Sequence, residues 1–198
     1  MAKSRYRLDN DVLSFRFTAT RIDRSDRPRE LLEQPGDLHE WFALHGLQVE
    51  AVGNDDLQEA RALREAIHRV GTALAGGGQP ALSDVAVINA AATAGRARRQ
   101  LGSDGERQWV PEDGFTAGDA LGVLAEDAIE KFSAHRDRIK ACGNPACRGL
   151  FLDSSRARNR RWCSMNFCGN RNKKLNFRHG HALVASDSTG HADRATEG

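Results

Sequence analysis

Four cysteines constrain the fold of this chain more than any other feature of its sequence. They lie within 27 consecutive residues, in the pattern C-x4-C-x15-C-x4-C. In a cytoplasmic protein, clustered cysteines are more often metal ligands than disulfide partners. Four thiolates fill the tetrahedron around one Zn²⁺ and leave no open position, which is typical of structural rather than catalytic zinc. We therefore predict one structural Zn²⁺ bound by Cys142, Cys147, Cys163 and Cys168.

Two other interpretations of the same cysteines stay open at this point. A redox-active disulfide pair is the main alternative, although the Cys-x-x-Cys spacing typical of redox motifs is absent. An iron–sulfur cluster is a lesser alternative, because such clusters are also held by four thiolates.

The residues around the cysteines predict a small module in the order loop, hairpin, helix. Residues 149–152 are typical of a strand, residues 153–159 of a polar turn and residues 160–162 of a returning strand. A helix is expected to begin at the second cysteine pair and to continue through Leu175. This is the order of a treble-clef zinc finger. Because the module has little apolar core, we expect the metal to supply much of its folding free energy; that core is Leu150, Leu152, Trp162 and Phe167.

Charge is unevenly distributed along the chain. Residues 136–178 hold twelve Lys or Arg against two acidic residues, a balance of +10, whereas the whole chain carries only +2 and the remainder therefore −8. Such a split indicates two parts with different partners. Cations on a rigid scaffold neutralise phosphates, so we predict that the basic part binds nucleic acid, with DNA favoured over RNA. The expected contacts are Arg156, Arg158, Arg160, Arg161, Arg171, Lys173, Lys174 and Arg178.

Two residues directly after the last cysteine have a second expected role. Asn170 and Arg171 follow Cys168 where the helix should begin. We expect them to hydrogen-bond to a thiolate or to the hairpin backbone at least as readily as to DNA.

The rest of the chain is predicted to be mostly helical. Apolar residues recur at helical spacing over residues 57–74, and three glycines from Gly76 to Gly78 should end that helix. Further helices are expected at residues 38–45, 82–93 and 116–139. Asp37 should be the N-cap of the helix at residues 38–45, and Asp55 that of the helix at residues 57–74. Residues 12–19 alternate apolar and polar and predict a half-buried strand, and residues 108–110 predict another.

The predicted organisation is a mostly α-helical N-terminal domain with a short strand or hairpin, followed by a treble-clef-like zinc module. The N-terminal domain should span residues 1–138 and the zinc module residues 139–181, followed by a disordered tail at residues 182–198. Apolar residues make up 39% of the chain, and no stretch approaches the roughly 20 apolar residues of a membrane helix. With no apolar segment near Met1 to act as a secretion signal, we expect a cytoplasmic protein with no membrane partner.

The C-terminal motif resembles the signature of a known family. Cys168-Gly169-Asn170-Arg171, preceded by Arg161-Trp162-Cys163-Ser164-Met165, is similar to the motif of the bacterial CGNR zinc-finger family. Residues 151–156 also resemble that family's hairpin. In this family a mostly helical N-terminal domain precedes the finger and is described as a regulator of stress-induced transcription. The resemblance thus implies a zinc finger, a helical N-terminal domain and a role in the stress response.

Two hypotheses of function follow. In the first, the protein regulates transcription: the finger binds DNA, and the N-terminal domain senses a small molecule or forms a homodimer. In the second, the zinc module is a protein-interaction or assembly element with no nucleic-acid role, and its basic face docks onto an acidic surface. Burial of Arg156 and Lys174 would favour the second hypothesis. We do not expect an enzyme, because no nucleotide-binding glycine pattern or catalytic constellation is visible.

Overall fold

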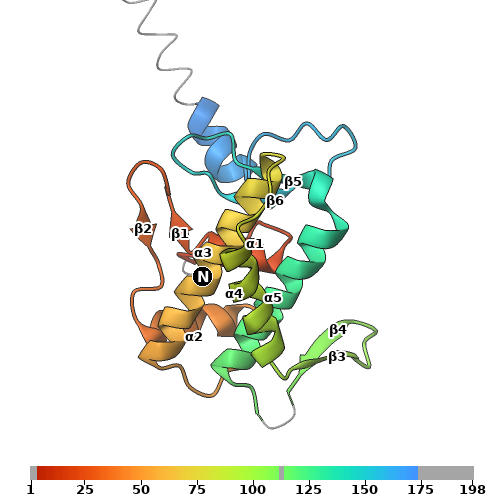
Figure 1. Cartoon of the computed structure of the whole chain (residues 1–198). Helices are drawn as coiled ribbons and strands as arrows, with labels where there is room; N and C mark the ends of the chain where they lie inside the picture. The colour runs from red at the N-terminus through yellow and green to blue at the C-terminus, as the bar shows by residue number, and fades with distance from the viewer. Residues whose placement is uncertain (1–3, 112–113, 174–198) are drawn as a thin grey trace, which may run out of the picture. The chain divides into compact units, whose positions relative to one another are not determined.

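Helices dominate the chain, and its strands form short antiparallel pairs (Figure 1). The computed structural model describes residues 4–111 and 114–173 and divides the chain into two compact units, Met1–Cys163 and Ser164–Gly198. The helices of the first unit are α1 (Leu13–Thr18), α2 (Pro35–Leu44), α3 (Asn54–Ala75), α4 (Leu82–Ala94), α5 (Ala117–Ala134) and the 3-10 turn η1 (Arg136–Arg138). Its strand pairs are β1 (Arg21–Ile22) with β2 (Arg29–Glu30), β3 (Arg98–Leu101) with β4 (Arg107–Val110), and β5 (Ile139–Ala141) with β6 (Leu150–Leu152). The predicted mostly helical class is confirmed.

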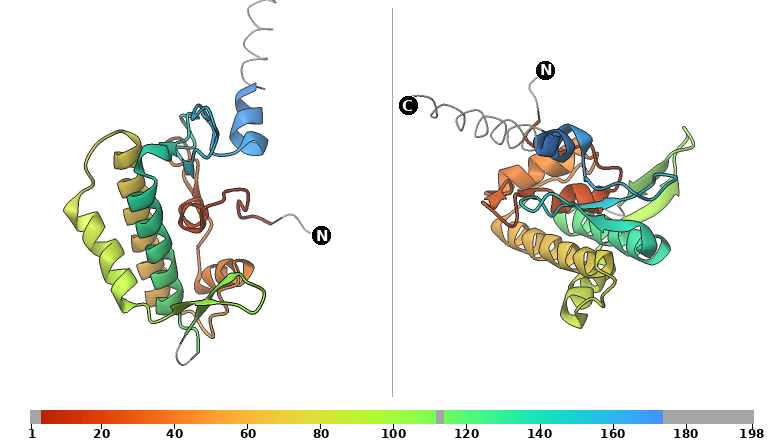
Figure 2. Two further views of the ribbon diagram at one scale, coloured as in Figure 1. Left: turned by 90° about the vertical axis from the view of Figure 1, so that its right-hand side faces the viewer. Right: turned by 90° about the horizontal axis from the view of Figure 1, so that it is seen from above.

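Three helices, α3, α4 and α5, pack side by side and form most of the core (Figure 2). The apolar stripe predicted for residues 57–74 is buried, and Gly76 is the C-cap of α3. The predicted helix at residues 82–93 is α4. Helix α5 is capped by Thr116, whose hydroxyl accepts the Asp119 N–H at 3.1 Å while the Asp119 carboxylate accepts the Thr116 N–H. These reciprocal bonds satisfy two N–H groups that a helix start leaves without partners.

The two aspartates predicted as N-caps occupy other positions in their helices. In α2 the cap is Gln34, and Asp37 lies one turn inside, where it accepts the backbone N–H of Gln34 at 3.0 Å. In α3 the cap is Gly53 and the predicted cap Asp55 is the second residue of the helix; the Gly53 N–H donates to the Asp56 carboxylate at 2.7 Å. The carboxylates of Asp37 and Asp56 thus accept the N–H of the cap residue from the third helical position. Both helices begin earlier than the sequence indicated.

The strand predicted at residues 12–19 is wrong, because Leu13–Thr18 form helix α1. Asn10 accepts the N–H of Val12 through its side chain, and Asp127 of α5 accepts that of Ser14. Ser14 and Thr18 are as buried as the phenylalanines between them. The apolar–polar alternation therefore does not separate a buried face from an exposed one. In this short helix both the apolar and the polar side chains named above are buried.

Two further predictions fail near the zinc module. The last helix ends at Ala134 and not near Ile139, and after η1 the chain becomes strand β5. The predicted strand at residues 149–152 is confirmed as β6, but it pairs with β5, with Ile139 opposite Leu152. Residues 160–162, predicted to form the returning strand, are not a strand. The hairpin therefore precedes the second cysteine pair entirely and has the first pair at its turn.

The β5–β6 hairpin packs directly on α3 and α1. Ile139 and Leu150 are both buried and belong to the same core as the helices. Gly71 of α3 allows this close packing, because a Cβ at that position would clash with the Leu150 side chain. The hairpin is thus part of the helical body of the first unit.

The second unit is described only for its first ten residues. Met165–Gly169 form a wide π-helical turn, η2, and the chain remains helical to Lys173. Ser164 caps this segment, since its hydroxyl accepts the Phe167 N–H at 3.3 Å and its carbonyl accepts the Cys168 N–H at 3.0 Å. The predicted tail at residues 182–198 lies outside the described residues.

None of the helices within residues 4–111 and 114–173 is long and apolar enough to cross a membrane.

Candidate metal centre

The four cysteines have the geometry of a zinc site. All are buried, and their sulfur atoms lie within 4.8 Å of one another. The Sγ atoms of Cys147 and Cys163 are 3.7 Å apart, too far for a disulfide of about 2.05 Å. Zn–S bonds of about 2.3 Å in a tetrahedron require sulfurs roughly 3.8 Å apart, so the donor set fits Zn²⁺. The chain therefore carries a zinc-binding site, and the redox disulfide is not formed.

A tight turn holds the first two ligands at the tip of the β5–β6 hairpin. The Cys142 N–H donates to the Gly149 carbonyl at 2.8 Å, and the Cys147 N–H donates to the Asn144 carbonyl at 3.0 Å. The turn then reverses at Arg148, which adopts a φ of 52°. The next residue is Gly149, and a Cβ at this position would lie only 3.3 Å from the Cys147 sulfur. Backbone hydrogen bonds thus orient both thiolates.

The third ligand is positioned by backbone contacts with the first turn. The Gly143 N–H donates to the Arg161 carbonyl at 2.8 Å, and the Cys163 N–H points at the Cys142 sulfur from 3.5 Å. Arg160 donates from Nη2 to the Cys163 carbonyl at 2.6 Å and lies 4.9 Å from the centre of the Phe151 ring. The guanidinium of Arg160 therefore holds the backbone that presents the third ligand.

A buried carboxylate fixes the other end of this segment. Asp153 is fully buried and accepts hydrogen bonds from Lys140 Nζ at 2.6 Å, from the Ser155 hydroxyl at 2.6 Å and from the Arg160 N–H at 3.0 Å. Burial opposes ionisation of Asp153, but the Lys140 ammonium and the Ser155 hydroxyl outweigh it and hold its pKa well below the usual value. Residues 153–163 thus form a loop anchored at both ends.

Arg7 is a metal-site residue that the sequence did not indicate. Its Nη1 lies 3.6 Å from the Cys147 sulfur and 4.0 Å from the Cys163 sulfur. A zinc ion with four thiolates carries a formal charge of −2, which a nearby cation stabilises. Nothing in the sequence links Arg7 to cysteines 140 and 156 residues later, so only the folded chain identifies it.

The predicted core of the zinc module is partly different from the observed one. Leu150 is buried as expected, but Phe151 is also buried, and Leu152 and Trp162 are half-buried. Phe167 is 41% exposed. Leu150 packs in the helical core while Arg160 covers the Phe151 ring, so β6 buries side chains on both faces.

Hydrogen bonds from three other segments of the N-terminal part also reach the module. The Asn10 amide donates to the Leu150 carbonyl at 2.9 Å, and the Ser25 N–H of the β1–β2 turn donates to the Ala146 carbonyl at 3.2 Å. His68 Nε2 of α3 lies 3.1 Å from the Arg148 carbonyl oxygen. His68 is half-buried at this contact.

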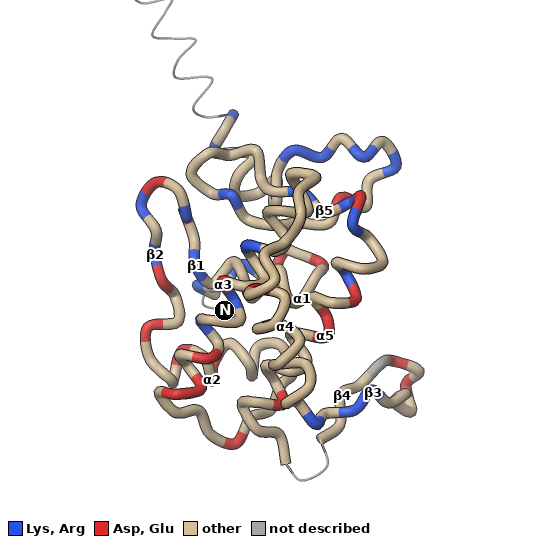
Figure 3. The backbone as a smooth tube through the Cα atoms, in the orientation of Figure 1, with Lys and Arg blue, Asp and Glu red and all other residues tan. Residues whose placement is uncertain are grey.

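The predicted nucleic-acid contacts on the loop differ in what they already bind. Arg156, Arg158 and Arg161 are exposed. Figure 3 marks the Lys and Arg positions along the backbone in blue, and several of them follow one another on a loop near β5. Arg158 forms an exposed ion pair with Asp137 at 2.5 Å, and Arg161 stacks over the Trp162 ring. Arg160 is only half-exposed and is engaged as described above.

The remaining predicted contacts belong to the second unit. Asn170, Arg171 and Lys173 are exposed on the helical segment that follows Cys168. Lys174 and Arg178 lie outside the described residues.

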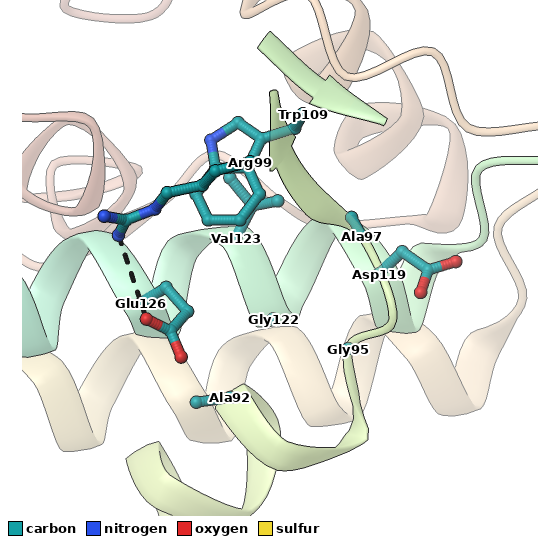
Figure 4. A pocket seen from close by; sticks show the side chains of 9 residues that line it. All are labelled: Ala92, Gly95, Ala97, Arg99, Trp109, Asp119, Gly122, Val123 and Glu126. Atoms are coloured by element: carbon teal, nitrogen blue, oxygen red, sulfur yellow. Dashed lines mark ion pairs between the residues drawn. The ribbon is translucent and has the colours of Figure 1, made fainter. Parts of the chain in front are cut away.

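A separate hollow of about 330 Å³ lies between α4, α5 and the β3–β4 hairpin (Figure 4). Arg99 stacks over Trp109 at 5.0 Å and forms ion pairs with Glu126 and Glu130. Asp119 is held by the cap of α5 and by the Arg96 N–H. The polar side chains of this hollow therefore serve mainly to hold the hairpin against α5.

Comparisons with known families agree with this geometry. Residues 11–135 match the family model ABATE, described as "Putative stress-induced transcription regulator", and residues 138–181 match the CGNR zinc finger. A search of curated proteins finds no match. Neither family description names an enzyme. The resemblance seen in the sequence is confirmed: the chain belongs to the ABATE family, described as stress-induced transcription regulators, and its metal centre is a CGNR zinc finger.

Proposed function

We propose that this protein is a transcription regulator that binds DNA through the basic residues of its zinc finger. The observation that carries the proposal is the loop of residues 153–163, where Arg156, Arg158 and Arg161 are exposed between two fixed ends, the Asp153 network and the ligand Cys163. A loop whose backbone is anchored loses less conformational entropy when its arginines meet phosphates than a flexible loop does. Arg160 acts within this loop as a scaffold residue.

The helical segment after Cys168 carries further cations that we propose to contact DNA. Arg171 and Lys173 are exposed, and Lys174 and Arg178 continue the same basic sequence. Asn170 and Arg171 are proposed to support the thiolates and the adjoining backbone as well. The proposal contains no catalytic step. It requires the protein to be in the same compartment as DNA, which is the cytoplasm expected from the sequence.

Among the described residues, no contact favours the alternative of an interaction module without a nucleic-acid role. Burial of Arg156 against an acidic surface would have favoured that hypothesis, and Arg156 is exposed. Lys174, whose burial would also have favoured that hypothesis, lies outside the described residues.

Fluorescence anisotropy with promoter DNA tests the proposal directly. Zinc-loaded full-length protein should bind at low salt, with an affinity that falls steeply as salt rises. Arg156→Gln and Arg161→Gln should each reduce the slope of log K against log [salt] by about 0.9 per lost phosphate contact. Arg96→Gln is the matched control, because Arg96 is exposed just after α4, outside the zinc finger. Absence of any binding at low salt would refute the proposal.

A further inference from the structure

Several arginines gather around a hollow on the N-terminal part of the chain, although the sequence outside the zinc module is acidic overall. The hollow measures about 660 Å³ and lies where the β1–β2 hairpin faces α3 and α4. Figure 3 shows Lys and Arg positions interleaved with acidic ones along that hairpin. The polar side chains that line it are Arg21, Glu30, Arg61, Arg64, Glu65 and Arg69. We refer to it as the arginine pocket.

Part of this positive charge is neutralised within the pocket. Arg64 is buried and forms a two-pronged pair with Glu30, with both distances 2.6 Å, while its Nε lies 2.9 Å from Glu65. Arg24, behind the pocket, forms a further pair with Glu65 at 2.7 Å. Two carboxylates thus balance two guanidiniums, and the same balance holds beside them where Arg69 pairs with Asp84 at 2.6 Å.

Two guanidiniums at the pocket remain in excess. The nearest carboxylate oxygen to Arg21 is 3.8 Å away on Glu65, which already serves Arg24 and Arg64. Arg61 donates to the Leu32 carbonyl at 2.6 and 3.0 Å, and a carbonyl neutralises no charge. The pocket therefore has a surplus of about two positive charges, one on the hairpin and one on α3.

The chemistry of this surplus selects the ligand. The planar donors of arginine match the oxygens of a phosphoryl group, which carries close to two negative charges at neutral pH. The volume lies within the range typical of small-molecule sites, and Val87, Ala62 and Pro28 provide apolar wall. Glu30 and Glu65 in the same pocket would repel a long polyanion such as DNA. We propose that the arginine pocket binds a small molecule carrying a phosphoryl group, which Arg21 and Arg61 hold.

Both walls of the pocket also touch the metal turn. The β1–β2 turn, which follows Arg21, bonds to Ala146 through Ser25. Helix α3 presents His68 to the Arg148 carbonyl one turn after the pocket residue Arg64. A ligand that draws the hairpin toward α3 would shift both contacts of the turn that bears Cys142 and Cys147. Occupancy of the pocket is therefore expected to alter DNA affinity, and this second half rests on the proposed function.

Binding is tested with zinc-loaded full-length protein by calorimetry and thermal shift. The probes are inorganic phosphate, glucose 6-phosphate and adenosine monophosphate, with glucose, adenosine, succinate and chloride at equal ionic strength as controls. A phosphoryl compound should raise the melting temperature and release binding heat, and its unphosphorylated counterpart should do neither. Arg21→Gln and Arg61→Gln should each weaken binding about tenfold or more, the loss expected for one charge-assisted hydrogen bond.

Matched variants distinguish a failed site from a failed fold. Arg29→Gln removes an exposed arginine of the same hairpin that does not line the pocket, and it should leave binding unchanged. Arg21 is 40% exposed at its side chain, so its substitution should preserve zinc content and circular dichroism even if Arg61→Gln does not. The proposal is overturned if no phosphoryl compound binds, if succinate binds equally well, or if Arg21→Gln and Arg29→Gln bind alike.

A DNA-binding experiment with and without the small ligand tests this inference separately from the proposed function. Saturating phosphoryl ligand should shift the DNA-binding midpoint of the native protein and not that of the Arg21→Gln/Arg61→Gln double variant. If the protein binds the ligand but never binds DNA, the proposed function fails and the pocket stands. If the DNA affinity is the same with and without bound ligand, the inference that the pocket regulates DNA binding is overturned. If the double variant binds DNA more weakly with no small anion present, the pocket contacts DNA phosphates and the small-molecule proposal is overturned.

Discussion

Arg7 contributes a charge to the metal centre from the opposite end of the sequence. Its guanidinium is 3.6 Å from the Cys147 sulfur, so Arg7→Gln should leave the negative thiolate cluster less stabilised. Zinc transfer to a colorimetric chelator should then be roughly tenfold faster, in the range seen when partners of metal ligands are removed. Arg7→Lys should restore part of the retention. Arg5→Gln is the control, because Arg5 binds Asp37 and Glu40. Equal release rates for the native protein and Arg7→Gln would contradict this role.

Glu65 should contribute stability that depends on pH. Burial alone would raise its pKa, but the guanidiniums of Arg24 and Arg64 outweigh burial and lower the pKa to about 2. Since the folded value lies below the unfolded one, the contribution is complete above about pH 4.5 and is lost as the pH falls toward 2. Glu65→Gln should cost about 2 to 3 kcal/mol in the free energy of unfolding at pH 7.

Urea denaturation at pH 7, 5 and 3 measures this contribution as a difference between two proteins. The gap between the native protein and Glu65→Gln should narrow at the lowest pH, even if both lose zinc there. A constant gap across this range would show that the carboxylate charge contributes nothing.

Helices α4 and α5 approach each other through two glycines. A Cβ on Gly122 would lie 2.6 Å from the Gly95 Cα, and a Cβ on Gly95 would lie 2.7 Å from the Gly122 Cα. Real Cβ atoms do not approach a backbone so closely, so Gly122→Ala should separate the two segments and destabilise the protein by about 2 kcal/mol or more. Denaturant unfolding measures the loss.

Another glycine of α5 gives the matched control. A Cβ on Gly118 would meet only the Thr116 hydroxyl, at 3.8 Å. Gly118→Ala should therefore stabilise the protein by up to about 1 kcal/mol through helix propensity. The close-approach argument would be wrong if both substitutions changed stability in the same direction.

Elements with a clear period and clear end signals could be predicted from the sequence. The apolar stripe of α3 and the glycines after it predict a helix on local grounds, and α4 follows from the same logic. Local signals fail for α1, where Ser14 is as buried as Phe15. They also fail for β5, because Phe132 and Ile139 keep a helical spacing of seven residues while the chain changes from helix to strand between them.

The candidate metal site was predictable only in its ligands. Four clustered thiols predict a metal site without any tertiary information, but the sulfur positions and the family match were needed to support zinc over the redox disulfide. The Arg7 contact and the arginine pocket combine side chains that are distant in sequence. Their positions depend on the packing of hairpins against α3, which no local pattern encodes.

At the scale of the molecule, metal binding and helix packing are parts of one cooperative structure. Cys142, Cys147 and Cys163 belong to the same compact unit as the helices, and β5 and β6 pack on α3. Removal of zinc by a chelator should therefore lower the melting temperature of the helical body by roughly 10 °C, the shift expected for about 3 kcal/mol.

Amide hydrogen exchange provides the sharper measurement of this coupling. Protection in α3 should fall when the metal is removed, because the strands that cover it lose their anchor. Cys142→Ser should show the same loss, and the chelator should have no further effect on it. Unchanged exchange in α3 after complete zinc removal would show that helices and finger unfold independently.

The contacts of Arg7 and Asn10 with residues beyond 146 have a consequence for biosynthesis. During translation these early residues leave the ribosome long before Cys147 and Leu150 are made, so Arg7 and Asn10 cannot form these two contacts until the metal turn has emerged. Such late closure increases the mean sequence separation of native contacts, which slows folding. A nascent chain stalled before Cys142 should thus remain susceptible to proteases at its leading end, and zinc availability at the moment of release would determine how many chains mature.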